Sequence, residues 1–512
     1  MKKELEAIVS QKAICLVLAV LCFLVYSNSF HNQFISDDIP GILNNPAIRQ
    51  PLKFLFYPDT VLSSLNYLIG QDNPFVYHLT NTLLHAASTI LVFLFLKSLF
   101  LLEAAFLGAA VFAVHPVHVE AVAWISGRPY PILAIVLLGV YLFFRKALED
   151  TFKVRYYVAS LLLFLYFSVK QFTLAPYIPV FLIVADVSFS KDWRCHWKWW
   201  IPFISIAAVR LLLAYFSIVQ RIQSVAQDTG GGFANPLFNM AYSFFAHAGL
   251  LLFPAKLTLY HEPAIISQWA LNLELVGLGV CLVLLPFLFR KARRLFFALV
   301  LLIIFLAPTY SPVQISWLVA ERYLYVPVLS LGMLWAYGYE RLAKKLSAKK
   351  KILVMIGIFV IASYSVRTVS RNEDWKTPGR FWRQTVEVSP VSPRAHNNMG
   401  DVYSREGNSA GAEFSFKRAI ELKPDYAEAY HNLANIYQHQ SRFIEAAQMY
   451  KNAISFKPGL FESQYNLGLI YLAQQELDLA MEQFNKSLQL RPADANARKA
   501  LSLVVRKKQE MR

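Results

Sequence analysis

Charged residues are scarce in this chain, and their scarcity excludes several classes of protein. They make up 16% of the 512 residues, against about 25% in a typical soluble domain. Hydrophobic residues reach 56% and aromatic residues 15%, and the mean hydropathy is +0.39. This composition excludes a disordered chain and a compact cytosolic enzyme, because most of the chain must lie in lipid.

Cysteine is nearly absent as well. The four cysteines are Cys15, Cys22, Cys195 and Cys281. Their spacing provides neither a disulfide framework nor a zinc site, so a secreted disulfide scaffold is excluded.

Acidic residues are few in the first 368 residues. That part holds 30 basic and 17 acidic residues, whereas residues 369–512 hold 20 and 16. The basic residues of the first part gather in short clusters between apolar runs, at 145–155, 191–198, 290–294 and 341–351. This is the positive-inside pattern of a membrane protein, and we expect no nucleic-acid partner.

Eleven apolar runs approach the roughly 20 residues that a membrane-spanning helix needs. They cover residues 13–30, 77–97, 104–125, 130–145, 156–173, 174–187, 199–219, 272–290, 295–311, 321–340 and 352–368. With the basic clusters inside, the N-terminus is cytoplasmic and the C-terminal segment lies outside. A further run, 238–253, breaks this alternation unless it is re-entrant or interfacial. We therefore expect an all-α, polytopic bundle of about 11 to 12 transmembrane helices in residues 1–368, with the first helix uncleaved.

The C-terminal part repeats with a period of 34 residues. Five kinds of position recur at this interval: Pro424, Pro458 and Pro492; Gly400, Ala434 and Gly468; Tyr403, Tyr437 and Tyr471; Ala412, Ala446 and Ala480; Phe416, Tyr450 and Phe484. Small residues let the two helices of a hairpin approach, aromatic residues fill the gap, and proline ends the second helix. The segment resembles the tetratricopeptide repeat. We expect three repeats in 393–494, after a linker and capping helix in 369–392 and before a capping helix in 495–512.

Stacked repeats of this kind form a curved solenoid with a concave groove. Five asparagines are expected on the groove side: Asn397, Asn398, Asn432, Asn435 and Asn466. Asparagines in such a groove either bind the backbone of an extended peptide or form ordinary solvated surface, and the sequence leaves both alternatives open. Nothing in the repeats indicates catalysis.

An acidic pair, Asp37 and Asp38, follows the first apolar run. Adjacent acids there either form a solvated turn or have a role in catalysis. A carboxylate at the membrane surface can accept a proton from a hydroxyl nucleophile, and a close neighbour tunes its pKa or orients it. The two residues are therefore candidates for catalysis.

A second polar cluster contains His115, His118 and Glu120, followed by Arg128. Ionisable residues at the mouth of a membrane helix are candidates for function. The two histidines and the glutamate are metal-ligand types, but Pro116 disturbs the helical register that aligns the imidazoles. A metal site, structural histidines and contact with a substrate all stay open. A divalent metal is not favoured, and no cofactor is expected.

Further charged residues lie at the ends of later apolar runs. Lys170 is either a snorkelling anchor or a cation for a lipid phosphate. Glu321 and Arg322 suit a local ion pair, and the planar fork of Arg322 also suits a phosphate. Arg210 lies within a run and must face protein or a cavity.

Five segments together carry a resemblance to a known family. They are Ser36-Asp37-Asp38, His78-Leu-Thr-Asn81-Thr-Leu-Leu-His85, His115-Pro-Val-His118-Val-Glu120-Ala-Val-Ala-Trp124, Ser168-Val-Lys170 and Glu321-Arg322-Tyr323-Leu-Tyr325. Their order resembles the transmembrane and tetratricopeptide-repeat O-mannosyltransferases, which belong to the polyprenyl-phosphate-sugar-dependent glycosyltransferases of the C superfamily. The resemblance covers essentially the whole chain.

The resemblance implies an enzyme of the bacterial inner membrane or the endoplasmic reticulum. It implies inverting transfer of a sugar from a polyprenyl- or dolichyl-phosphate donor to Ser or Thr hydroxyls on the non-cytoplasmic face, with the repeats recruiting the acceptor protein. Asp37 then corresponds to the general base and Asp38 to its orienting neighbour, and Arg322, Lys170 and Arg128 are candidates for the lipid phosphate. The family's Arg-Pro-Leu stretch has only a displaced counterpart in Arg49-Gln-Pro51-Leu52, so the sugar is not implied.

Two other classes of function compete with the enzyme. One is a non-catalytic membrane scaffold whose repeats recruit partner proteins, in which Asp37 and Asp38 are dispensable. The other is a transporter or lipid flippase. A transporter is typified by a broken helix or an internal duplication at the bilayer midplane, and the sequence has neither.

Overall fold

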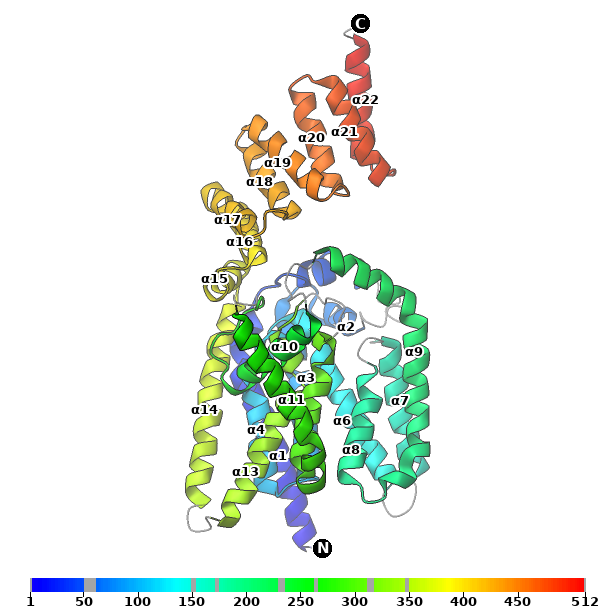
Figure 1. Cartoon of the computed structure of the whole chain (residues 1–512), viewed down its shortest axis with the longest axis vertical. Helices are drawn as coiled ribbons and strands as arrows, with labels where there is room; N and C mark the ends of the chain where they lie inside the picture. Colours follow the sequence, from blue (N-terminus) through cyan, green and yellow to red (C-terminus); the bar gives the residue numbers. More distant parts are fainter. Residues whose placement is uncertain are drawn as a thin grey trace. The chain divides into compact units, whose positions relative to one another are not determined.

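The computed structural model describes residues 2–49, 61–148, 153–170, 175–228, 235–261, 266–310, 317–345 and 350–510. These residues form helices and contain no β-strand, so the predicted all-α class is confirmed. The chain divides into two compact units, Met1–Pro378 and Gly379–Arg512 (Figure 1).

The first unit is a bundle of helices joined by short helical turns. Its α-helices are α1 (Lys2–Tyr26), α2 (Val61–Gly70), α3 (Pro74–Lys97), α4 (Leu102–Val114), α5 (Val119–Val122), α6 (Pro129–Ala147), α7 (Val154–Lys170), α8 (Tyr177–Phe189), α9 (Trp193–Asp228), α10 (Pro236–Leu252), α11 (Gln268–Lys291), α12 (Arg293–Phe305), α13 (Val328–Lys345) and α14 (Lys350–Asp374). The short turns are η1 (Ser27–His31), η2 (Ile39–Leu43), η5 (Pro116–His118), η6 (Ile125–Gly127), η7 (Ala307–Tyr310) and η8 (Glu321–Leu324).

Six helices among the described residues are long and apolar enough to cross a membrane, or seven if one bent pair is a single span. The expected count of 11 to 12 is not confirmed by this length criterion, because several apolar runs form shorter helices than their sequence length predicts. Pro116 interrupts the run 104–125, where α4 and the segment Pro116–Val122 meet at 47°. The run 321–340 starts as the turn η8, and α13 begins only at Val328, directly after Pro327. Helix α10, which contains most of the run 238–253, has 17 residues.

Close packing of small residues joins α4 to α13. A Cβ atom added to Gly108 would lie 2.5 Å from the backbone oxygen of Gly332, and one added to Gly332 would lie 2.7 Å from that of Gly108. The two helices are therefore in backbone contact. Membrane helices pack in this way because lipid gives them no hydrophobic drive to associate.

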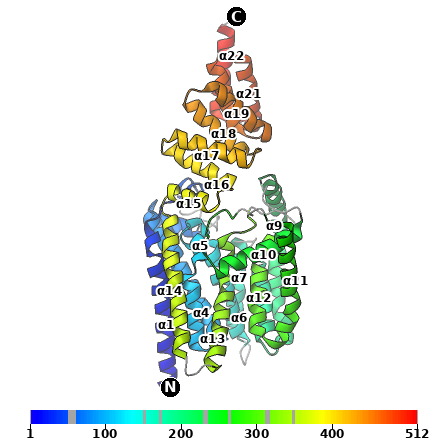
Figure 2. The ribbon, with the colours of Figure 1, turned by 60° about the vertical axis from the view of Figure 1, so that its left-hand side comes forward.

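The second unit contains the repeats. Its helices are α15 (Pro378–Val388), α16 (Pro393–Arg405), α17 (Ser409–Leu422), α18 (Ala427–His439), α19 (Phe443–Phe456), α20 (Phe461–Ala473), α21 (Leu477–Leu490) and α22 (Ala495–Glu510), and they pack as successive antiparallel pairs (Figure 2). Added Cβ atoms at Gly400 and Gly468 would lie 2.6 Å and 2.8 Å from the rings of Phe416 and Phe484. The small and aromatic positions of the 34-residue period thus pack against each other inside each helix pair.

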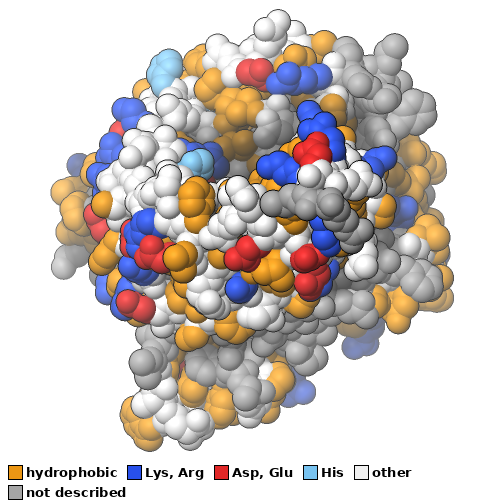
Figure 3. All heavy atoms as spheres, turned by 90° about the horizontal axis from the view of Figure 1, so that it is seen from above, with side chains coloured by type: hydrophobic (Ala, Val, Ile, Leu, Met, Phe, Trp, Pro, Cys, Tyr) orange, Lys and Arg blue, Asp and Glu red, His pale blue; other side chains and the backbone are white. Residues whose placement is uncertain are grey.

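The surface of the repeats is charged in both signs. Exposed ion pairs one helical turn apart include Arg418–Glu421 at 2.9 Å and Arg405–Asp401 at 2.9 Å. In the space-filling view, acidic and basic side chains are interspersed rather than gathered by sign (Figure 3). Such exposed pairs contribute little to stability, so the aromatic core carries most of it.

Candidate functional site

Asp38 is a buried anchor of the loop that follows η1. The side chain is 1% exposed, and its Oδ1 accepts hydrogen bonds from the backbone N–H of Ser126, at 2.8 Å, and from the Ser126 hydroxyl. Its Oδ2 accepts from the backbone N–H of Ile35 at 3.2 Å. Two donors of Ser126 therefore hold Asp38 against η6, and the third, from Ile35, lies within the loop itself. The acidic loop is thus fixed to a segment 88 residues away.

Asp37 lies beside this anchor but faces outward. Its side chain is exposed, and its nearest polar contact is a long one, 3.5 Å from the Ser36 hydroxyl. Ser36 adopts a φ of 55°, a left-handed conformation that a non-glycine residue rarely adopts. This turn separates the two acids: Asp38 points into the protein, and the side chain of Asp37 stays exposed.

Polar contacts between α1 and α14 hold the beginning of the loop. The Asn32 side chain donates to the backbone oxygen of Asn372 at 3.1 Å, and Asn372 donates to that of Val25 at 2.9 Å. His78 Nε2 on α3 lies 3.0 Å from the backbone oxygen of Asn32. The first helix, the last helix and α3 together set where the acidic pair begins.

Arg128 follows Ser126 by two residues, and one of its buried N–H donors has no partner among the described residues. Its Nε donates to the backbone oxygen of Ile125 at 3.2 Å and its Nη1 to the Ser63 hydroxyl at 3.1 Å. The Nη2 atom is buried without a hydrogen-bond partner among the described residues. Unsatisfied buried donors are rare and costly, so this guanidinium is suited to an anion that enters the site.

Gly127 allows this arrangement. A Cβ atom there would lie 2.6 Å from the backbone oxygen of Glu120 and 2.8 Å from the Cα of Ala121. No side chain fits between η6 and α5. Glycine therefore lets Ser126 and Arg128 lie directly against the Glu120 segment.

Two buried ion pairs lie close to α5, formed by Glu120 with Arg322 and by Glu321 with Arg371. Glu120 forms an ion pair with Arg322 and also accepts the backbone N–H of Arg322 at 2.9 Å. Glu321 pairs with Arg371 of α14 at 3.2 Å and lies 3.5 Å from His261. Because Glu120 already neutralises Arg322, Arg322 is less available to a lipid phosphate than Arg128 is.

His115 and His118 are fully buried behind these charges. Their Nε2 atoms lie 2.9 Å from the backbone oxygen of Leu251 and 3.1 Å from that of Tyr325, respectively. Among the alternatives left open by the sequence, this geometry favours structural histidines. No group of three or more His, Cys, Asp or Glu side chains in the described part of the chain is arranged to hold a metal ion.

The remaining cations lie near the end of α7. Lys170 is the last residue of that helix, and its side chain lies outside the described residues. Arg210 of α9 donates to the backbone oxygens of Ser168, at 3.0 Å, and Val169, at 3.4 Å. Arg210 thus caps the C-terminus of α7, where a cation stabilises unpaired carbonyls.

The asparagines of the repeats form hydrogen bonds between successive repeats. Asn432 donates to Asn397 at 3.0 Å, and Asn466 donates to Asn435 at 3.3 Å and to the Tyr450 hydroxyl at 3.2 Å. Asn397 is buried, whereas Asn398, Asn432, Asn435 and Asn466 are partly exposed. These side chains use part of their hydrogen-bonding capacity within the solenoid and keep the rest for its surface.

Several residues that complete the site were not among the candidates predicted from the sequence. They are Ser63, Ser126, His261 and Arg371. Arg371 follows an apolar run, where an arginine usually snorkels, and serine has no distinctive pattern. Only the fold brings these residues to the charged candidates.

We expect the loss of activity at low pH, the acid limb of the pH profile, to follow the protonation of Asp38. Burial raises the pKa of Asp38 to about 6. The hydrogen bonds from Ser126 and Ile35 and the charge of Arg128 lower this pKa, but burial has the larger effect. Because the folded protein binds this proton more tightly than the unfolded chain, the free energy of unfolding falls as pH rises from 3.8 to about 6. Activity should show the opposite trend and rise through pH 6, since only the carboxylate accepts all three donors.

Ser126→Ala is the matched variant for this pH profile. It removes the hydroxyl donor and keeps the backbone N–H, so the acid limb should move up by about half to one pH unit. Thr80→Ala, which removes a hydroxyl of α3 that does not contact Asp38, should leave the limb in place. An unshifted limb in Ser126→Ala would mean that another group controls the profile.

The repeats match known family models. Tetratricopeptide-repeat models match residues 393–426, 415–448 and 461–494, which confirms the repeats. Among solved structures, the crystal structure of MamA is 24% identical and covers 26% of this chain and 77% of that chain, with a TM-score of 0.25.

Curated relatives extend across most of the chain. "Protein O-mannosyl-transferase TMTC3" of Mus musculus is 26% identical, in an alignment that covers 79% of this chain and 50% of the relative. "Protein O-mannosyl-transferase F38B6.6" of Caenorhabditis elegans is 25% identical and covers 79% of this chain and 62% of the relative. The chain spans about half the length of the first of these relatives.

Proposed function

Because the chain is a homologue of the transmembrane and tetratricopeptide-repeat O-mannosyltransferases, we propose that it is a membrane glycosyltransferase acting on proteins. The donor is a sugar linked to a polyprenyl or dolichyl phosphate. The acceptor is a Ser or Thr hydroxyl on the non-cytoplasmic face. The membrane is the bacterial inner membrane or that of the endoplasmic reticulum.

One observation carries this proposal: an exposed carboxylate next to a buried, fixed one, with an unsatisfied guanidinium nearby. Asp38 and Arg128 are joined through η6, since Asp38 accepts from Ser126 and Arg128 follows two residues later. Asp37 is exposed beside them. A base, its anchor and an anion-binding group are thus held in one loop cluster.

The proposed reaction balances in a single displacement. Asp37 accepts the proton of the acceptor hydroxyl while that oxygen forms a bond to the anomeric carbon. The bond between the anomeric carbon and the phosphate oxygen breaks, and its electron pair leaves with the polyprenyl phosphate. Attack from the opposite side inverts the anomeric centre, as in inverting hydrolysis. The phosphate leaves without protonation, so the Arg128 Nη2 donor suffices and the reaction needs no cofactor.

The proposal is tested by reconstitution. The purified chain in detergent should transfer labelled sugar from a synthetic polyprenyl-phosphate mannose to a Ser/Thr peptide, and not to the same peptide with alanines. Polyprenyl-phosphate glucose and a nucleotide sugar serve as alternative donors, and a chelator arm tests the metal. Absence of transfer from every lipid-linked donor would contradict the proposal and favour the scaffold.

The proposed topology places the acidic loop and the repeats on the same side. With 11 to 12 spans and the N-terminus in the cytoplasm, cysteines introduced at Ser36 and Ser409 should react with an impermeant thiol reagent in intact cells. A cysteine in 341–351 should react only after lysis. A cysteine-free background removes the four native thiols as a source of signal. Labelling of 341–351 with Ser409 protected would reverse the topology.

The repeats are proposed to recruit the acceptor rather than to catalyse. Their partly exposed asparagines, Asn398, Asn432, Asn435 and Asn466, supply amide groups for a peptide backbone. Removing residues 393–512 should therefore lower transfer to a folded protein by at least about tenfold, and transfer to a short peptide much less. Equal loss on both substrates would show that the repeats serve folding instead.

A further inference from the structure

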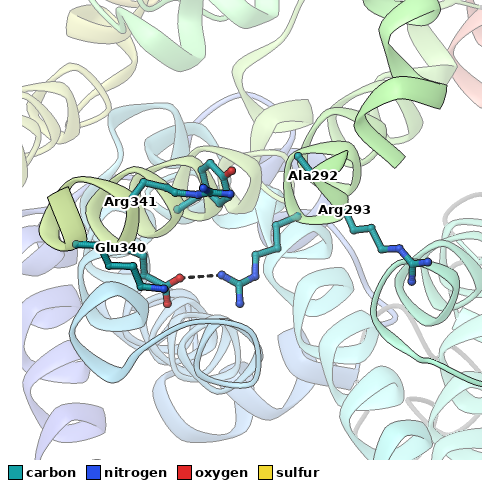
Figure 4. A pocket seen from close by; sticks show the side chains of 7 residues that line it. Ala292, Arg293, Glu340 and Arg341 are labelled. Atoms are coloured by element: carbon teal, nitrogen blue, oxygen red, sulfur yellow. Dashed lines mark hydrogen bonds and ion pairs between the residues drawn. The ribbon is translucent and has the colours of Figure 1, made fainter. Parts of the chain in front are cut away.

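A basic pocket is lined by residues of the junction between α11 and α12 and of the last turns of α13. These segments lie at the end of the bundle where α1 begins (Figure 1). The pocket has a volume of about 440 Å³ and lies between the start of α12 and the last turns of α13. Its lining residues are Ala292, Arg293, Arg294, Tyr337, Glu340, Arg341 and Lys344. Figure 4 shows Glu340 and Arg341 on one helix and Ala292 and Arg293 on the segment across the pocket.

The single acid of the pocket is already neutralised. Glu340 accepts from the backbone N–H of Leu101 at 2.6 Å and pairs with Arg294 at 2.8 Å. The Arg294 guanidinium also lies 4.5 Å from the ring centre of Phe100. Glu340 and Arg294 therefore hold the wall of the pocket together, and neither carries a charge that a ligand needs to satisfy.

Three cations remain without an acidic partner. Within the described ranges, Arg293, Arg341 and Lys344 are exposed and form no ion pair. Arg293 and Arg341 lie over the rings of Phe289 and Tyr337, at 5.2 Å and 5.1 Å. These aromatic contacts hold the guanidinium groups in place and leave their N–H donors available. The pocket thus presents three positive charges.

Exposed apolar side chains also lie on α13 and on α11, the helix that ends at the pocket. Val283 and Phe287 of α11 are 78% and 59% exposed, and Leu334 and Leu342 of α13 are 43% and 44% exposed. Only 11% of the apolar window of α11 is buried within the chain. A ligand with an anionic head and long apolar tails matches this combination better than a free phosphate does.

We propose that the pocket lined by Arg293, Arg341 and Lys344 binds the phosphate headgroup of an anionic phospholipid. Cations between membrane helices on the cytoplasmic side are suited to such headgroups, and the basic clusters of this end face the cytoplasm in the proposed topology. The lipid bound here is not the sugar donor, because the acidic loop lies at the other end of the bundle. This site therefore stands independently of the catalytic proposal.

Lipid binding to the purified full chain tests the proposal. The chain in detergent is titrated with phosphatidylglycerol or phosphatidylcholine, and bound lipid is counted by native mass spectrometry. Phosphatidylglycerol should bind at least about tenfold more tightly, since each basic residue near an anionic lipid contributes about fivefold. Arg293→Gln/Arg341→Gln/Lys344→Gln should lose this preference. The control Lys191→Gln/Arg194→Gln/Lys198→Gln, with the same change in charge, should keep it.

Other arms separate the remaining explanations. Arg341→Lys keeps the charge and should retain most of the preference, which guards against a variant that merely unfolds. Equal binding of both lipids by the native chain, or equal loss in both triple variants, would overturn the proposal. Competition by glycerol phosphate at the same concentration as phosphatidylglycerol would assign the pocket to a soluble phosphate and overturn the lipid assignment.

Discussion

Asp37→Asn is expected to lower the turnover of sugar transfer by roughly 10²–10⁴, the range typical for loss of a general base. The amide keeps the shape of the side chain and removes the site that accepts the proton. Asp37 is exposed and makes only a 3.5 Å contact with Ser36, so its replacement should leave the fold intact. Donor affinity should change little, because a different residue, Arg128, has the free anion-binding donor.

Asp38→Asn is the informative comparison for this experiment. Asp38 is buried with three hydrogen-bond donors around it, so its amide should lower stability as well as activity. Asp37→Asn should lower kcat alone at an unchanged melting temperature. A fully active Asp37→Asn enzyme would show that Asp37 is not the base, and an inactive one with lost donor binding would show that it contacts the donor.

Glu120→Gln is expected to lower the free energy of unfolding by about 3–5 kcal/mol, the cost of leaving one member of a buried ion pair without its partner. Glu120 is fully buried, and the side chain of Arg322 is 10% exposed. The amide oxygen of glutamine can still accept the backbone N–H of Arg322, so the variant removes the charge and little else. Thermal unfolding in detergent measures the loss.

Two further variants make this experiment specific. Asp72→Asn makes the same chemical change in the exposed Arg49–Asp72 pair, whose side chains are 46% and 48% exposed, and should cost no more than about 1 kcal/mol. Glu120→Leu/Arg322→Met should recover most of the stability, because removing both charges leaves none unpaired. If the double variant is stable but inactive, the pair also positions the site; if it is as unstable as Glu120→Gln, the charge is not the cause.

The repeats and most helices could be predicted because their patterns are local. A period of 34 residues places small and aromatic side chains opposite each other, and Gly400 packs on Phe416 as that period predicts. Apolar runs predicted the helices, whereas the predicted number of spans is not confirmed by helix length. Run length does not reveal where a proline such as Pro116 bends the helix or where Pro327 delays its start.

The candidate site was predictable only in part, because its residues meet through distant contacts. The adjacency of Asp37 and Asp38 is evident in the sequence, but which acid is buried depends on Ser126, 88 residues away. Likewise Glu120 meets Arg322 across 202 residues. No local pattern records such pairings, so the division of roles between the two acids follows from the fold.

The contact between Gly108 and Gly332 restricts how this fold can vary. Each glycine lies against the backbone oxygen of the other, at 2.5 Å and 2.7 Å from an added Cβ. A larger residue at one position cannot be accommodated by a smaller residue at the other, because glycine is already the smallest residue. A chimera that takes α4 from a relative must therefore also take α13 from it, unless the α4 of that relative has glycine at the position of Gly108.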